Sequence, residues 1–225
     1  MITGLPVGQH ISFKYKDKEG KDCIRSYTPI TSDDEVGYVD FIIKVYFANT
    51  HKRFPKGGAM TQHLNSLKVG DTMLMRGPKG HVTYKGYGKY TIKPLGKEEK
   101  SYSNKKFGFI AGGSGITPCM QVIRDMLKRA DDNTNIWLIY ANVTEGDILL
   151  REELESLVLQ YKGRFNLHFT LDNPPEEDWN GSSGWIDTEM CENHLPKPTS
   201  ESFVFICGPP PMIKYVNYAM VMLYV

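Results

Sequence analysis

The stretch G-G-S-G-I-T-P at residues 112–118 decides how the rest of this chain is interpreted. It follows the apolar run 107–111, which predicts a buried strand, and precedes residues 119–127, whose apolar side chains recur at helical spacing. A strand, a glycine turn and a helix opened by a proline indicate the start of a βαβ unit. At such a turn the free N–H groups of the helix face a crevice where a pyrophosphate can bind. An ordinary βα turn is the alternative, because Pro118 takes the place of the third glycine of the dinucleotide fingerprint.

The composition is that of a globular protein and excludes several classes of function. The chain has 225 residues, enough for two small domains, and its net charge of +1 gives no reason to expect nucleic acid binding. No apolar stretch approaches the length of a membrane span, and the first residues do not resemble a signal peptide. The 4 widely spaced cysteines favour reduced thiols in a cytosolic setting, and the 6 histidines show no metal-ligand spacing, so no metal is expected.

Residues 1–94 are expected to form an antiparallel β domain. The strand candidates, separated by glycine-containing turns, are residues 7–15, 39–47, 72–76 and 90–92. This pattern is typical of a small antiparallel barrel, and one short helix at residues 61–67 interrupts it. Residues 95–105 are polar and aperiodic, and they are interpreted as a linker.

Residues 106–225 change to strands alternating with helices, which predicts a Rossmann-like, doubly wound parallel sheet. The predicted strands are 107–111, 136–141, 165–171 and 203–207, and the predicted helices are 118–130, about 147–161, and 188–194. The motif C-G-P-P-P-M at 207–212 follows the fourth strand, at the edge where ligands bind in this architecture. Core packing is the alternative explanation for Cys207.

Two further motifs in the β domain are compatible with ligand binding. In R-S-Y-T-P at 25–29, Arg25 and Tyr27 share one face of a strand end, so a guanidinium can pair with phosphate while a phenol lies along a flat ring. G-G-A-M-T at 57–61 opens the short helix and offers a second phosphate-compatible helix N-terminus. Taken singly, an exposed strand end and an ordinary loop are the more frequent explanations.

The order of these motifs closely resembles the NADH–cytochrome b5 reductase family of ferredoxin-reductase-like flavoproteins, a group that includes the flavin module of nitrate reductase. The resemblance rests on R-S-Y-T-P, I-I-K-V-Y-F at 42–47, G-G-A-M-T, G-G-S-G-I-T-P and C-G-P-P-P-M, and it covers residue 5 to about residue 213. It implies an FAD-binding barrel followed by an NADH-binding domain. It also implies hydride transfer from NADH to flavin N5, followed by single-electron transfer to cytochrome b5 or a similar haem protein.

The resemblance also implies roles for individual residues. Arg25 is expected to hold the FAD pyrophosphate, Tyr27 to lie against the flavin, and Thr28 to reach N5. The expected catalytic residues are Thr28, His10, Lys44 and Cys207, with a proton relay from N5 through Thr28 to His10. A histidine satisfied on the strand surface is the alternative for His10. The expected cofactor-binding residues are Arg25, Tyr27, Thr28, Pro29, Ile43, Lys44, Val45, Tyr46, His51, Phe54, Gly58, Met60, Thr61, Gly113, Ser114, Thr117, Pro118, Asp172, Cys207, Gly208, Pro209 and Met212.

The preference between NADH and NADPH is expected to depend on Asp172. This residue opens the acidic segment 172–178, and the segment 142–147 after the preceding strand has no basic residue. A 2′-phosphate requires arginine or lysine nearby, whereas a free ribose suits an acidic acceptor. Without the resemblance, a solvated charged loop is the alternative explanation for the acidic segment. With the resemblance, NADH is the expected cofactor.

The ends of the sequence differ from the family pattern. The family has about one more barrel strand before residue 5 and a last strand ending in an aromatic residue after the 207–212 motif, and both are absent here. A truncated sequence and a divergent subunit whose ends a partner covers both agree with this. An NADH oxidoreductase is the main expectation, and the alternatives are a flavin module of a larger haem enzyme such as nitrate reductase and a non-catalytic structural subunit. The expected location is cytoplasmic, with any membrane attachment through a segment absent here.

Overall fold

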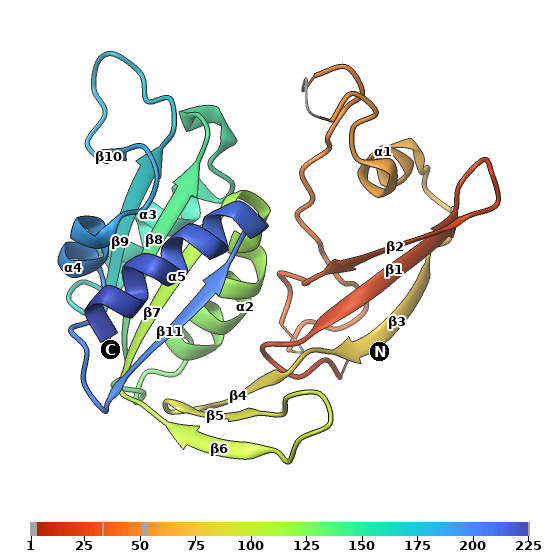
Figure 1. Cartoon of the computed structure of the whole chain (residues 1–225). Helices are drawn as coiled ribbons and strands as arrows, with labels where there is room; N and C mark the ends of the chain where they lie inside the picture. Colours follow the sequence, from red (N-terminus) through yellow and green to blue (C-terminus); the bar gives the residue numbers. More distant parts are fainter. Residues whose placement is uncertain (1–3, 33, 51–53, 225) are drawn as a thin grey trace.

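The computed structural model describes residues 4–32, 34–50 and 54–224 (Figure 1). The elements follow in the order β1 (His10–Lys16), β2 (Asp22–Tyr27), α1 (Ala59–Ser66), β3 (Leu74–Lys79), β4 (Val82–Gly86), β5 (Lys89–Ile92), β6 (Lys100–Ser103), β7 (Lys106–Gly112), η1 (Gly113–Gly115), α2 (Ile116–Leu127), β8 (Asn135–Asn142), η2 (Glu145–Asp147), α3 (Arg151–Gln160), β9 (Phe165–Leu171), β10 (Ser182–Ser183), α4 (Thr188–His194), β11 (Ser202–Cys207) and α5 (Pro210–Tyr224).

The second half of the chain forms the predicted parallel sheet. Its five strands lie in the order β10-β9-β8-β7-β11, so the chain moves outward from β7 to β10 and then returns to the other side of β7. The direction of winding therefore reverses between β7 and β11, and the crevice above their carboxyl ends is where such sheets bind ligands. Strand β9 and helix α4 have the bounds that the sequence predicts, and β10 is a strand that it did not predict.

The core lies on both faces of this sheet because side chains alternate along each strand. Phe107 and Phe109 of β7 pack with α2 and α3 on one face, where Tyr90 of β5 joins the same cluster. Ile110, the residue that follows Phe109 on the strand, packs on the other face with residues of α4 and α5. The helices thus cover both faces, as a doubly wound sheet requires (Figure 1).

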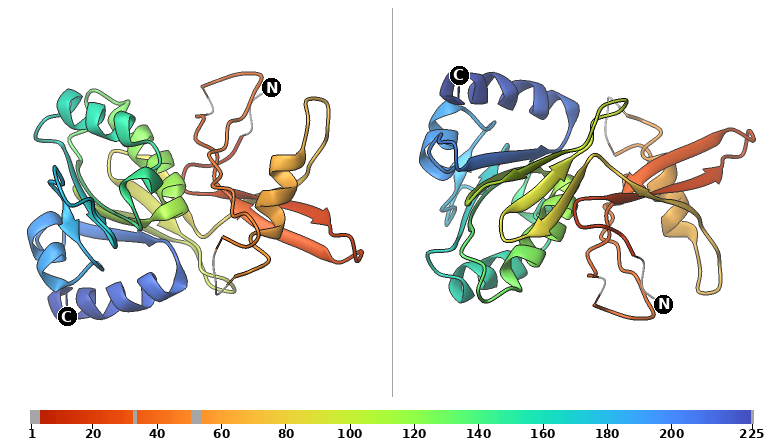
Figure 2. Two further views of the ribbon diagram at one scale, coloured as in Figure 1. Left: turned by 90° about the horizontal axis from the view of Figure 1, so that it is seen from above. Right: turned by 90° about the horizontal axis from the view of Figure 1, so that it is seen from below.

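The first half forms antiparallel sheets, which confirms the predicted fold class of this region. Strands β2-β1-β3 make one three-stranded sheet, and β4-β5-β6 make another that lies between the first and the parallel sheet (Figure 2). The prediction of a strand at residues 39–47 is wrong, since this segment enters no ladder. Its backbone instead bonds to loops: Ile30 N donates to Asp40 O and Gly58 N to Tyr46 O.

The segment interpreted as an aperiodic linker contains strand β6. Residues 100–103 pair with β5 along their whole length, and all four side chains are exposed. This strand is held mainly by its backbone ladder, and its single aromatic residue, Tyr102, which stacks on Tyr90, is too little to mark it in the sequence.

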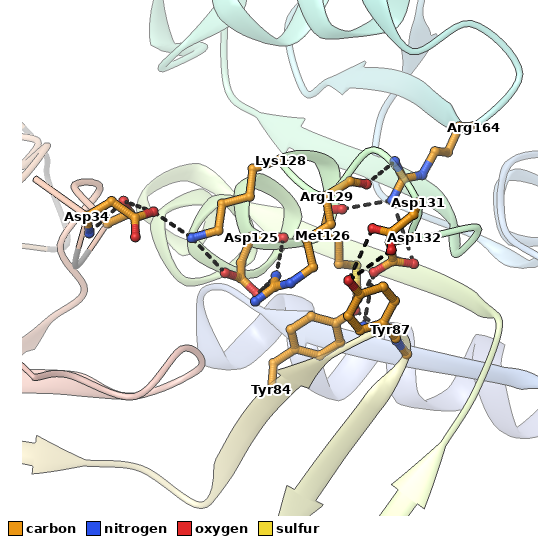
Figure 3. Close-up of polar contacts among 12 residues, drawn as sticks. Asp34, Tyr84, Tyr87, Asp125, Met126, Lys128, Arg129, Asp131, Asp132 and Arg164 are labelled. Atoms are coloured by element: carbon orange, nitrogen blue, oxygen red, sulfur yellow. Dashed lines mark hydrogen bonds and ion pairs between the residues drawn. The ribbon is translucent and has the colours of Figure 1, made fainter.

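A polar network fixes the β4–β5 hairpin and the first half to the end of α2 (Figure 3). Asp132 is 2% exposed and accepts hydrogen bonds from Tyr87 N at 3.1 Å and Thr134 N at 2.8 Å. At the other end of the network, Lys128 Nζ lies 2.7 Å from Asp34 Oδ2 and 3.3 Å from Asp125 Oδ1. The contacts of Asp132 with Tyr87 and of Lys128 with Asp34 join segments that are distant in sequence, so they hold the two halves in one arrangement.

Candidate functional site

A cleft of about 880 Å³ lies between the two halves of the molecule. One wall comes from β2, α1 and the segment before α1, and the other comes from the carboxyl ends of β7 and β11. The predicted site residues that line it are His10, Arg25, Tyr27, Thr28, Ile43, Lys44, Tyr46, Gly58, Met60, Thr61, Gly113, Ser114, Thr117, Pro118, Cys207, Gly208 and Pro209. The structure thus gathers residues that lie far apart in the sequence, from His10 to Pro209.

The glycine motif shapes the sheet side of the cleft. Gly113 has a φ of +51°, and a Cβ there would meet nothing within 4 Å, so its backbone is open to an incoming group. At Gly115 a Cβ would lie 2.2 Å from Cys207 O, so only glycine allows the loops after β7 and β11 to touch. Helix α2 begins directly after this turn, at Ile116, and the positive end of its dipole can attract an anion.

The opposite wall carries Arg25, Tyr27 and Thr28. Nη1 of Arg25 donates to Ile24 O at 2.7 Å, which turns the guanidinium back along its own strand. The Tyr27 ring packs on Phe13 with ring centroids 4.9 Å apart, and burial raises the pKa of its phenol. Thr28 is 7% exposed. A cation, a flat phenol and a hydroxyl therefore lie in sequence along one side of the cleft.

Two titratable groups in the cleft favour their neutral forms. Burial, with the charges of Lys79 and His81, lowers the pKa of His10, so its imidazole is neutral near pH 7. Burial raises the pKa of the Cys207 thiol, so it is protonated and is not an activated nucleophile. All four cysteines are free thiols.

A second cleft of about 330 Å³ continues the first along the edge of the sheet. The two share Lys44, Tyr46, Gly112, Gly113 and Pro209. The second cleft contains the predicted residues Asp172 and Met212, together with Asn142, Asp147, Trp185 and Tyr215, which the sequence did not single out. Trp185 and Tyr215 meet edge to face at 5.4 Å and are 59% and 44% exposed, so they offer a flat apolar surface at its mouth.

Lys44 and Asp147 form an ion pair where the clefts meet. The lysine ammonium lowers the pKa of the Asp147 carboxyl, which also caps η2 through the Thr144 hydroxyl and N–H. The T-x-x-D capping spacing at 144–147 was visible in the sequence. Its pairing with Lys44, 103 residues away, could not be predicted without the fold.

The remaining predicted residues lie elsewhere or are engaged. Pro29 lines a separate cleft beside Arg124 and Lys128. Val45 and Phe54 line neither of the two clefts described above, and His51 lies outside the described residues. Thr61 is in the first cleft, but its hydroxyl accepts from Tyr46 N and donates to Gly58 O, so it also anchors α1.

Known proteins share both halves of this arrangement. Residues 1–84 match the family model of the oxidoreductase FAD-binding domain, and residues 109–218 match the oxidoreductase NAD-binding domain. NADH-cytochrome b5 reductase 1 of Homo sapiens is 50% identical over 94% of this chain and 69% of its own length. NADH-cytochrome b5 reductase 2 of Xenopus laevis is 47% identical over 95% of this chain and 72% of its own length. The chain belongs to the NADH–cytochrome b5 reductase family.

A solved structure supports the same family. The cytochrome b5 reductase domain of Ulva prolifera nitrate reductase superimposes with a TM-score of 0.92 at 39% identity, over 99% of this chain and 82% of that one. Among the described residues, no helix is both long and apolar enough to cross a membrane, and no group of three or more His, Cys, Asp or Glu side chains is placed to hold a metal.

The residues present fit FAD and NADH. The open backbone at Gly113 and the start of α2 suit a phosphate, and Arg25 provides a cation on the facing wall. Tyr27 provides a flat partner for a ring, and the Trp185–Tyr215 pair provides another at the far end. The two clefts therefore form one continuous groove with two anion sites and two aromatic surfaces. Two dinucleotides need such features to bind their phosphates and their rings.

Proposed function

We propose that this chain is an FAD-dependent NADH oxidoreductase that passes electrons to cytochrome b5 or a similar one-electron haem protein. The observation that carries the proposal is the single cleft in which the R-S-Y-T-P and G-G-A-M-T motifs face G-G-S-G-I-T-P and Cys207–Pro209. The names of the relatives support NADH as donor and cytochrome b5 as acceptor. The cytoplasmic location expected from the sequence stays a prediction.

Bound FAD supplies the chemistry that no side chain has, which is to accept a hydride and to release electrons one at a time. The residues of the chain bind and orient FAD and NADH. Arg25 holds phosphate, while Thr28 presents a hydroxyl and the neutral His10 a proton acceptor on the same cleft wall. On the sheet side, the protonated Cys207 packs beside the glycine turn and shapes the space for the nicotinamide.

The proposal is tested by the visible spectrum of the purified protein. It should contain the flavin absorption bands, and NADH added without oxygen should bleach them within seconds. Cytochrome b5 added afterwards should be reduced, with two haems reduced for each NADH consumed. A protein that binds FAD without bleaching would instead support a non-catalytic subunit of the same fold.

A second candidate function is that of a flavin module in a larger haem enzyme. The TM-score of 0.92 with a nitrate reductase domain favours it. In that case the acceptor is a haem domain covalently linked to the flavin module. Separate cytochrome b5 should then be reduced far more slowly than ferricyanide, which takes electrons without specific docking.

A further inference from the structure

Asn142, the last residue of β8, is buried in the second cleft without a hydrogen-bond partner. The residue lines that cleft and is 7% exposed. Neither Nδ2 nor Oδ1 has a partner among the described residues. A buried amide left unpaired destabilises a fold, and asparagine is also unfavourable in a strand. Both atoms are unpaired, so either orientation of the amide presents a free donor and a free acceptor.

The nearby groups are already engaged. The Tyr140 hydroxyl donates to Gly113 O at 3.1 Å and accepts from Leu149 N at 3.3 Å. Burial raises the pKa of this phenol to about 12, a rise that the neighbouring Asn142 amide and the Leu149 N–H oppose. Asp172 is joined to Asn142 only through the backbone, where Asp172 N donates to Asn142 O at 3.0 Å. The fold therefore supports the Asn142 backbone and leaves its side chain for something else.

The strand order indicates what that is. Strand β8 lies between β7, which ends at the phosphate-compatible glycine turn, and β9, which ends beside Asp172. A dinucleotide with phosphates at that turn and its adenosine ribose at Asp172 must pass over the end of β8. A ribose hydroxyl both donates and accepts, which matches the two unpaired atoms of the amide.

We propose that Asn142 binds an adenosine ribose hydroxyl of NADH, with the hydroxyl donating to Oδ1 and accepting from Nδ2. Asn142 is then a ligand-binding residue that the apo protein keeps unpaired at a cost in stability. This inference rests on the proposed function of the same clefts. The proposal predicts that replacing Asn142 weakens ligand binding without lowering the stability of the protein. Replacing an asparagine with a purely structural role would instead lower stability and leave the affinity unchanged.

The test titrates ADP-ribose into the oxidised, FAD-loaded protein by calorimetry. Asn142→Leu, similar in size and unable to hydrogen-bond, should raise the Kd for ADP-ribose about tenfold. Its unfolding temperature without ADP-ribose should equal or exceed that of the parent. The control Asn166→Leu, on β9 with its amide bonded to Ile136 O, should leave the Kd unchanged. If Asn142→Leu folds poorly, Asn142→Ala is used in the same comparisons of affinity.

Analogues of ADP-ribose that lack one adenosine ribose hydroxyl identify the contact. One of these analogues should already bind the parent protein more weakly than ADP-ribose does. Asn142→Leu should raise the Kd for that analogue little further, because both changes remove the same hydrogen bond. The assignment is overturned if Asn142→Leu leaves the Kd unchanged, or if its effect adds independently to the losses seen with both the 2′- and the 3′-deoxy analogue. A large fall in unfolding temperature with normal affinity also overturns it. A parent protein that binds no ADP-ribose would instead contradict the proposed function itself.

Discussion

Arg25 is the residue on which the predicted flavin site depends. Its guanidinium borders the cleft and can form a charge-assisted pair with phosphate, which contributes about 1.5–3 kcal/mol. Arg25→Ala should therefore weaken FAD binding by roughly 10- to 150-fold. Flavin content after purification and the Kd of the apoprotein for FAD measure this. Arg76→Ala, an exposed arginine on β3, is the control and should retain its flavin.

Asp172 is the residue predicted to distinguish NADH from NADPH. It lies in the second cleft, where burial raises the pKa of its carboxyl. Asp172→Ala removes the repulsion of a 2′-phosphate and should narrow the ratio of kcat/KM for NADH over NADPH by roughly tenfold. Glu176→Ala, an exposed acid in the same segment, should leave that ratio unchanged. If both variants behave like the parent, the discriminator lies elsewhere.

The sequence could predict the site where its residues lie in short motifs, and it failed where the contacts are distant. Arg25 and Gly113 each belong to a motif whose local geometry indicates phosphate binding. The Lys44–Asp147 pair and the unpaired Asn142 have no local signal, because each depends on which strand ends the sheet brings together. Asparagine at the end of a strand is ordinary until its burial and lack of partners are known.

At the scale of elements, predictability follows the source of each element's stability. Strand β7 and helix α2 are buried, so hydrophobic periodicity marks them. Residues 39–47 have strand-like composition but form no ladder, and β6 has a ladder with Tyr102 as its one aromatic residue. Amino-acid composition indicates which segments are buried and which side chains fit a sheet. A strand, however, is defined by its backbone hydrogen bonds to a neighbouring strand, and these cannot be identified from composition.

Strand β9 and helix α4 contain a stacked histidine pair that predicts acid sensitivity. The rings of His168 and His194 are 3.5 Å apart and nearly parallel, and His168 Nε2 lies 2.8 Å from Ser182 Oγ. Burial, and then the charge of His194, lowers the pKa of His168 to about 4. The unfolded chain, with a histidine pKa near 6.5, binds more protons between these two values. Stability from this group is thus complete above about pH 6.5 and is lost as the pH falls toward 4.

The measurement for this pair is urea unfolding at pH 7.5 and pH 5. Because the rings are only partly buried, the expected contribution to the loss of stability is of the order of 1 kcal/mol. His168→Gln should reduce the difference between the two pH values, whereas the exposed His81→Gln should not. An equal pH dependence in His168→Gln and the parent would assign the acid sensitivity to other groups.

At the scale of the whole molecule, the two halves share one core and one polar network, so we expect them to unfold together. Tyr84 and Tyr90 of the β4–β5 hairpin pack in the same cluster as Phe107 of the parallel sheet. The buried Asp132 binds Tyr87 N of that hairpin and lies 3.7 Å from Arg164, which follows α3 (Figure 3). Removal of the Asp132 carboxylate leaves buried N–H donors without an acceptor and a guanidinium without its counter-charge. This loss lowers the free energy of unfolding by about 2–4 kcal/mol.

Two probes can follow the two halves separately. The 3 tryptophans all lie beyond residue 106 and report on the parallel sheet, whereas flavin fluorescence reports release from the first half. In the parent protein both signals should change at the same urea concentration. Asp132→Ala should move both midpoints down by the same amount, while Asp131→Ala, which loses only the exposed contact with the Tyr87 hydroxyl, should move neither by much. A shift of the tryptophan signal alone would show that the halves unfold independently, with the parallel sheet lost while the first half still holds its flavin.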